Sequence, residues 1–179
     1  QDAEYVSWLE RAAGANASDI RPRVLLATYY LRKNEFSKAL ALAREAQSAH
    51  PDNLQAIEVL GTVQLAAGDS EDALVTYGKL VRIAPKEPAE HYKLATAQAI
   101  RKDFDAAKGS LNKALALKPD YLDAEILLAL VELDANHPDE ALKIAQQIEQ
   151  MQPTSPTGFL PHGDVMMTKT HIPPALPAS

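Results

Sequence analysis

Small and apolar residues return along this chain at intervals of 34 residues. Alanine recurs at Ala39, Ala73, Ala107 and Ala141. Leucine recurs at Leu26, Leu60, Leu94 and Leu128, and the residue after each leucine is alanine or glycine. A fixed period of roughly 20 to 50 residues is typical of proteins built from stacked repeats. Counting in this phase, we expect complete copies of the repeat to begin at Ile20, Leu54, Pro88 and Leu122.

Each copy of the repeat predicts two helices that cross closely, because small side chains let two backbones approach. In the first copy these helices are expected over Pro22–Arg32 and Phe36–Ala49, and in the fourth copy the second helix is expected to open at Pro138. The first helix of each copy should stop at a residue in the left-handed conformation, which glycine and asparagine tolerate best. The residues at this position are Asn34, Gly68, Lys102 and Asn136.

Prolines in the same phase separate the copies, at Pro51, Pro85, Pro119 and Pro153. The residue after the proline is Asp52 in the first copy, Asp120 in the third and Thr154 in the fourth, each of which can cap a helix. We therefore expect these residues to cap the helix that follows.

The two ends of the chain continue the same phase. Residues 1–19 are predicted to be the second helix of a truncated repeat, in which Tyr5, Trp8 and Leu9 would lack their usual partner. Residues 156–179 are predicted to be an incomplete fifth repeat with a proline-rich end, partly helical over Phe159–Met167. Because both ends fall inside repeats and the chain opens on Gln1, we expect a fragment of a longer array that self-associates end to end or exchanges its tail.

Composition narrows the classes of function. The formal net charge is −6 and lysine and arginine do not cluster, which argues against nucleic acid as a partner. No apolar run is long enough to be a transmembrane segment. The chain has no cysteine, which excludes disulfides and thiolate zinc sites, and its five histidines lack metal-ligand spacing. Because no catalytic motif is present either, we expect no enzyme activity, no cofactor and no metal.

The alanines, leucines and prolines in phase resemble the tetratricopeptide repeat (TPR) family over nearly the whole chain. The resemblance implies an all-α, right-handed superhelical solenoid of antiparallel helix pairs. It also implies a non-enzymatic scaffold that binds a peptide or a partner protein in a concave groove. The expected division begins with the truncated repeat at 1–19. Four complete repeats follow at 20–53, 54–87, 88–121 and 122–155, and a partial repeat at 156–179 ends the chain.

In the TPR family the first helix of each repeat lines the groove. Transferring the family's groove positions to this chain gives the candidate groove residues Thr28, Arg32, Val59, Thr62, Tyr92, Lys93, Thr96, Ala99, Ile126, Leu127 and Leu130. The three threonines form a ladder that suits an extended or helical peptide with apolar anchors. The simpler alternative is that these threonines only tolerate a half-exposed helix face.

Two short stretches resemble a narrower group, the TPR lipoproteins of the bacterial PEP-CTERM/exosortase system. They are Gly158–Met167 and the turn Leu65–Asp69, which is followed by Ala73 and Leu74. This resemblance implies a membrane-tethered, extracytoplasmic scaffold, associated with the periplasm or outer membrane, that assists exopolysaccharide or surface-protein export. Two alternatives remain open: a cytoplasmic co-chaperone or assembly adaptor, and a regulatory TPR segment of a larger enzyme. Of the carboxylate-clamp positions of the co-chaperones, only Lys93 is close to the expected residue.

Overall fold

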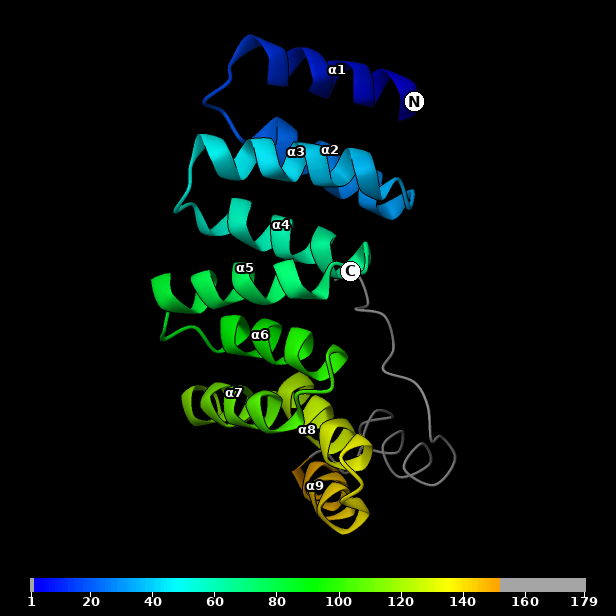
Figure 1. The fold of residues 1–179 in the computed structure, drawn as a ribbon, viewed down its shortest axis with the longest axis vertical. Helices are drawn as coiled ribbons and strands as arrows, with labels where there is room; N and C mark the ends of the chain where they lie inside the picture. The colour runs from blue at the N-terminus through cyan, green and yellow to red at the C-terminus, as the bar shows by residue number, and fades with distance from the viewer. Residues whose placement is uncertain (1, 152–179) are drawn as a thin grey trace. The chain divides into compact units, whose positions relative to one another are not determined.

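A computed structural model of the protein describes residues 2–151, and within this range every regular element is an α-helix. The helices form two compact units that divide between Ile83 and Ala84. The first unit contains α1 (Asp2–Ala15), α2 (Arg21–Arg32), α3 (Phe36–Ala49), α4 (Leu54–Ala66) and α5 (Ser70–Ile83). The second unit contains α6 (Pro88–Ile100), α7 (Phe104–Leu117), α8 (Leu122–Asp134) and α9 (Pro138–Met151) (Figure 1).

Successive helices pack as pairs, α2 with α3 and α4 with α5 in the first unit, and α6 with α7 and α8 with α9 in the second. We call α2, α4, α6 and α8 the A helices and α1, α3, α5, α7 and α9 the B helices. The B helices each have 14 residues, and their first residues are 34 apart. The helix expected over Phe36–Ala49 and the helix start at Pro138 are confirmed, while the first A helix begins at Arg21, one residue early. The division of the chain into individual repeats stays a prediction.

The predicted left-handed stop of each A helix is confirmed. Asn34, Gly68, Lys102 and Asn136 have φ values of 59°, 87°, 62° and 65°. After α2, the amide of Glu35 donates to the carbonyl of Tyr30 and the amide of Asn34 donates to that of Leu31, which is the Schellman arrangement. The same two bonds follow α4, α6 and α8. Each A helix thus ends at a defined residue, and the turn that follows leads the chain into the B helix of the same pair.

The core lies where A and B helices cross. The recurring alanine of the B helices is fully buried in every copy, at Ala39, Ala73, Ala107 and Ala141. The recurring leucine of the A helices is buried at Leu26 and Leu60 in the first unit but only half-buried at Leu94 and Leu128 in the second. The small residues therefore set the crossing distance throughout, while the leucine fills space to a different degree in the two units.

Gly61 shows how close the crossing is. A Cβ atom on this residue would lie 2.5 Å from the Cε1 atom of Tyr77, which is buried on α5. At the equivalent place in the second unit, Ala95 on α6 and Leu111 on α7 are both fully buried in one apolar cluster. The crossing of α4 with α5 and the crossing of α6 with α7 thus use different pairs, a glycine with a tyrosine and an alanine with a leucine.

The predicted helix caps are wrong by one residue. The N-cap of α4 is Asn53 rather than Asp52, and its side-chain oxygen accepts a hydrogen bond from the amide of Ala56 at 3.0 Å. The N-cap of α8 is Tyr121 rather than Asp120, and no side chain bonds there. The loop after each B helix is one residue longer than the capping rule assumed, so the side chain that meets the helix start is the later one. Thr154 lies outside the described residues.

Three apolar side chains of α1 differ in burial, and the expectation that they lack the partner helix of their own repeat stays a prediction. Tyr5 and Trp8 are exposed, whereas Leu9 is fully buried with Ala13 and Leu26. Leu9 faces α2, which packs against α1 and supplies the missing apolar contact. The predicted fifth repeat, with its helical stretch over Phe159–Met167, lies outside the described residues.

Candidate binding surface on the A helices

Within one unit, neighbouring A helices contact each other more than neighbouring B helices do. α2 packs against α4 in the first unit, and α6 packs against α8 in the second. Among the described residues, α3 makes no comparable contact with α5, nor α7 with α9. A stack of helix pairs is more tightly spaced on its inner side. The A helices therefore form the inner wall of each unit, which is the side that carries the candidate groove residues.

The predicted threonine ladder exists, but its hydroxyl groups bond to their own helices. Thr28, Thr62 and Thr96 each donate to the carbonyl four residues earlier, at Oγ1–O distances of 2.8, 2.9 and 3.0 Å. All three side chains are half-buried. A hydroxyl that donates inside its helix keeps only acceptor capacity for a ligand. This geometry favours the simpler alternative for the threonines, and the apolar residues beside them become the main candidates for contact.

In the first unit, the candidate residues divide by exposure. Arg32 at the end of α2 is exposed, and Val59 on α4 is half-buried against the apolar clusters of the unit. Leu25 on α2 also lies at a groove position of the family pattern, and it is 46% exposed. The open apolar surface of this wall is thus mostly leucine and valine.

In the second unit, two candidates are closed to a ligand. Ala99 on α6 and Leu127 on α8 are buried in the same apolar cluster. These two residues pack beneath the wall and expose almost no surface to a ligand. Thr96, Ile126 and Leu130 are half-buried on the wall itself. Ile100, at another groove position of the family pattern, is 40% exposed at the end of α6.

Two tyrosines form the aromatic part of the second unit's wall. The rings of Tyr92 and Tyr121 lie 5.4 Å apart at a tilt of 45°, and the ammonium of Lys118 lies 5.1 Å from the centre of the Tyr121 ring. Burial raises the pKa of Tyr121 to about 12, and the carboxylate of Asp123 adds to this effect. Burial, followed by the charge of Asp123, also raises the pKa of Tyr92. Both phenols stay protonated at neutral pH and can donate hydrogen bonds.

Tyr121 was not predicted from the sequence, because it precedes α8 rather than lying on it. The equivalent residues are Asn53 and Glu87, so periodicity gave no reason to select it. Lys93, which was predicted, is paired within α6: its ammonium lies 3.2 Å from a carboxylate oxygen of Glu90. Its charge is therefore partly neutralised before any ligand arrives.

The inner face of α8 has a charge pattern of its own. Exposed carboxylates lie at both ends, Asp123 in the first turn and Asp134 at the last residue. Ile126, Leu130 and Leu133 lie between them and are half-buried. An apolar strip of this kind between two negative charges favours a ligand with apolar side chains flanked by positive ones.

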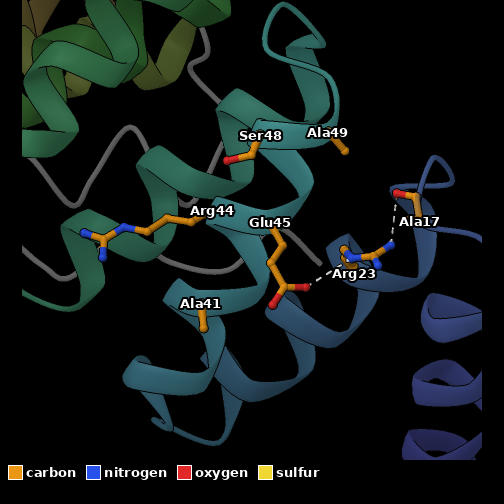
Figure 2. A pocket seen from close by; sticks show the side chains of 7 residues that line it. All are labelled: Ala17, Arg23, Ala41, Arg44, Glu45, Ser48 and Ala49. Carbon is orange, nitrogen blue, oxygen red and sulfur yellow. Dashed lines mark hydrogen bonds and ion pairs between the residues drawn. The ribbon is translucent and has the colours of Figure 1, made fainter.

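A separate hollow lies on the other side of the first unit, and Figure 2 shows the seven side chains that line it. At its edge, the guanidinium of Arg23 donates to the carbonyl of Ala13 at 2.9 Å and lies 3.2 Å from a carboxylate oxygen of Glu45. It also donates to the carbonyl of Ala17 at 3.4 Å (Figure 2). These hydrogen bonds satisfy backbone carbonyl groups in the last turn of α1 and in the loop just after it. Arg23 thus fixes α1 to α2 and is not a free anion-binding group.

Residues 2–151 contain no helix that is long and apolar enough to span a lipid bilayer. Within the same residues, no three histidine, aspartate or glutamate side chains come together in a way that could hold a metal ion.

Comparison with known proteins gives the same picture of the fold. Two models described as tetratricopeptide repeat match residues 24–88 and 99–157, which together exceed half of the chain. A tetratricopeptide repeat protein from Parabacteroides merdae superposes with a TM-score of 0.80 at 20% identity, covering 89% of this chain and 64% of that one. The TPR protein TTC0263 of Thermus thermophilus superposes with a TM-score of 0.74 at 23% identity, covering 91% and 89%.

Two further matches are to another solved structure and to a much longer protein. YrrB, described as a TPR protein with an unusual peptide-binding site, superposes with a TM-score of 0.67 at 20% identity, covering 88% of this chain and 81% of that one. Protein CTR9 homolog of Arabidopsis thaliana is 25% identical over 130 residues, which is 68% of this chain but only 11% of that protein. At these identities the likeness to the solved structures shows the fold alone. With the Schellman stops and the buried alanines in phase, the matches show that this chain belongs to the tetratricopeptide repeat family.

Proposed function

We propose that this chain is a non-enzymatic scaffold that binds a peptide segment of a partner protein along its A helices. The proposal rests on the wall that neighbouring A helices form by contact in each unit. Apolar and aromatic side chains on this wall are half-exposed. The TPR fold is a scaffold for protein–protein interaction. The peptide-binding site named in the description of YrrB, a protein of the same fold, supports this direction.

The second unit's wall favours one class of peptide. Tyr92 and Ile126 offer flat and branched apolar surface, while Asp123 and Asp134 place negative charge at both ends of α8. The ligand that fits is a segment with apolar anchors and a lysine or arginine on either side. Its affinity should fall with rising salt, because the flanking charges are exposed and screened.

The test starts from a phage library of random peptides selected on the full chain. Enriched peptides should carry apolar residues flanked by basic ones. Tyr92→Ala and Ile126→Asp should each weaken the best peptide by about tenfold or more, as for a central contact of an interface. Val75→Asp is the matched control, because Val75 is 72% exposed on the B helix α5. Peptides that are unaffected by the changes at Tyr92 and Ile126 would place binding elsewhere and refute the proposal.

We further propose an extracytoplasmic setting, in which the scaffold is part of a bacterial TPR lipoprotein linked to exopolysaccharide or surface-protein export. The support is the resemblance of Gly158–Met167 and of the Leu65–Asp69 turn to repeats of that group. The alternatives are a cytoplasmic co-chaperone or assembly adaptor and a regulatory segment of a larger enzyme. Fractionation of cells that produce the tagged full-length product separates them: recovery with the outer membrane supports export, and recovery in the cytosol contradicts it.

A further inference from the structure

The tyrosine pair of the second unit does not follow the period of the repeat. The residues equivalent to Tyr92 in the other copies are Val24, Glu58 and Ile126. Both rings of the pair pack against the apolar cluster of the unit and are half-buried. Residues that stack the repeats recur in every copy, as the buried alanines of the B helices do. Stacking of the repeats therefore does not by itself explain why two tyrosines meet here.

The two rings come from neighbouring helix pairs. Tyr92 lies on α6 and Tyr121 is the residue before α8, and these two helices contact each other. The ring centres are 5.4 Å apart and the ring planes are tilted by 45°. Because both side chains are only half-buried, part of each ring stays open to solvent. The face of a tyrosine ring carries partial negative charge and attracts a cation.

One cation of the chain already lies on this pair. The ammonium of Lys118 is 5.1 Å from the centre of the Tyr121 ring. The two residues belong to one turn, in which the amide of Tyr121 donates to the carbonyl of Lys118 at 3.2 Å. Lys118 is exposed, and among the described residues its ammonium has no carboxylate partner. The ring thus accepts a cation, and an exposed contact of this kind is weak enough for another cation to replace it.

The carboxylate of Asp123 adds negative charge beside the rings. Asp123 is two residues after Tyr121, in the first turn of α8, and it is exposed. Burial raises the pKa of both phenols, and the charge of Asp123 is the next cause for each. On α6, Lys93 and Glu90 pair with each other at 3.2 Å. Asp123 has no ion-pair partner within residues 2–151, so its charge can pair with a ligand.

We propose that Tyr92, Tyr121 and Asp123 form a site for one arginine side chain of the peptide that binds along the A helices, and that Lys118 occupies this site until the peptide arrives. The inference rests on the proposed function and adds the residue type that this part of the wall selects. The guanidinium of the peptide lies flat on the Tyr121 ring and donates hydrogen bonds to the carboxylate of Asp123. This double contact replaces the weaker contact of Lys118 with the ring.

Arginine fits this site better than lysine for two reasons. Its guanidinium is planar and stacks on an aromatic ring, and its N–H groups match the two oxygens of a carboxylate. A lysine of the peptide would only repeat the contact that Lys118 already makes with the ring. Lys118 therefore competes with the peptide, and removing its charge should strengthen binding. A purely structural role of Lys118 in its turn predicts no such gain.

The peptides selected on the full chain supply the first test. They should carry arginine, rather than either basic residue, at one position beside the apolar anchors. In isothermal titration calorimetry, changing this arginine of the best peptide to lysine should weaken binding about fivefold, and changing it to citrulline about tenfold, because citrulline keeps the shape and loses the charge. If the arginine and lysine peptides bind equally, this inference fails while the proposed peptide binding stands.

Variants of the chain test the role of Lys118. Lys118→Ala should strengthen binding of the arginine peptide about threefold, the scale of one exposed cation–π contact, and should leave the citrulline peptide unaffected. Lys113→Ala, the matched loss of an exposed charge on α7, should change nothing. Tyr121→Leu should weaken the arginine peptide about fivefold, whereas Tyr121→Phe keeps the ring face and should stay within about twofold. No gain from Lys118→Ala, or an equal gain from Lys113→Ala, overturns the proposal.

A small probe separates this site from the rest of the wall. N-acetyl-arginine methylamide at millimolar concentration should shift the ring resonances of Tyr92 and Tyr121 in NMR spectra of the full chain, and the lysine analogue should shift them less. If the arginine probe shifts neither ring, the arginine site is refuted. If it shifts both rings while no selected peptide binds the A helices, the arginine site stands and the proposed function fails. Circular dichroism of each variant verifies that the helices are intact.

Discussion

The two units build the same helix crossing from different side chains. In the first unit, Gly61 on α4 faces the ring of Tyr77 on α5. In the second, Ala95 on α6 and Leu111 on α7 occupy the equivalent positions and are fully buried. The second pair has a larger residue on the A helix and a smaller one on the B helix. The crossing thus accepts different pairs of residues, provided that neither side chain collides with the other.

The units also differ in how they stop their A helices. The first unit uses asparagine and glycine at the left-handed residue, at Asn34 and Gly68. The second also uses asparagine, at Asn136, but it has Lys102 at the other stop, with φ 62°, although the Cβ atom of lysine makes that conformation less favourable. The hydrogen bonds of the stop are the same in both units. The backbone bonding of the turn therefore prevails over the preference of the side chain.

The largest expected effect is a collision at the first unit's crossing. Gly61→Leu should lower the free energy of unfolding by about 3 kcal/mol, the upper end of the usual cost of overpacking. Urea denaturation measures this loss. Because neighbouring repeats share their stability, amide exchange should rise in α3 as well as in α4 and α5. Gly109→Leu is the control, since its Cβ atom would meet nothing within 4 Å. Faster exchange confined to one helix pair would contradict the shared stability.

A smaller effect is expected when the second unit's pair is transplanted into the first. Gly61→Ala alone should cost about 2 kcal/mol, because the new Cβ atom collides with Tyr77. Adding Tyr77→Leu should recover most of this loss and leave the double variant within about 1.5 kcal/mol of the native chain. The coupling is read from urea denaturation of the two single variants and the double. If the two effects simply add, the collision between the new Cβ atom and the ring of Tyr77 is not the cause of the loss.

The turn residues should respond in opposite directions. Gly68→Ala should destabilise the chain by about 1 kcal/mol, because alanine at φ 87° is strained. Lys102→Gly should stabilise it by up to about 1 kcal/mol for the converse reason. Thermal unfolding of both variants measures the two shifts. Arg101→Gly, one residue earlier in the ordinary helical region, should destabilise, and a gain there would show that the left-handed conformation is not the cause.

The smallest effect is expected from ionisation of the tyrosine pair. It leaves the stability unchanged at neutral pH and becomes visible only at alkaline pH. The folded state raises the pKa of Tyr121 to about 12 from the ordinary value of 10.0, so the unfolded chain loses this proton first. The stability that comes from the protonated phenol is present below about pH 10 and is lost as the pH rises toward 12. Urea denaturation in steps of pH should show a steeper alkaline decline for the native chain than for Tyr121→Phe. Equal declines would remove Tyr121 as the cause.

Much of the fold could be predicted from the sequence, because the helix pair is a local unit with a strict period. The bounds of α3, the start of α9 and the left-handed stops follow from residues close together in the chain. The capping residues at Asn53 and Tyr121 were missed by one position, since they depend on how the loop after each B helix meets the next A helix.

Less of the candidate site could be predicted, because exposure depends on neighbouring helices. A family position selects a side of the helix but does not say how deep a side chain lies. Ala99 and Leu127 hold groove positions and are buried, whereas Leu25 and Ile100 hold groove positions as well and are open. The bonding of the threonine hydroxyls to their own helices was also not evident from their regular spacing.

By itself, the sequence determined the repeat, its phase and the places where the A helices stop, because small residues and left-handed turns act within a few residues of the chain. Only the tertiary structure decided which wall stays open, that Tyr121 joins Tyr92, and that α2 covers Leu9 of α1 while Trp8 stays exposed. These outcomes depend on which helices pack together, and a periodic pattern gives every copy the same neighbours.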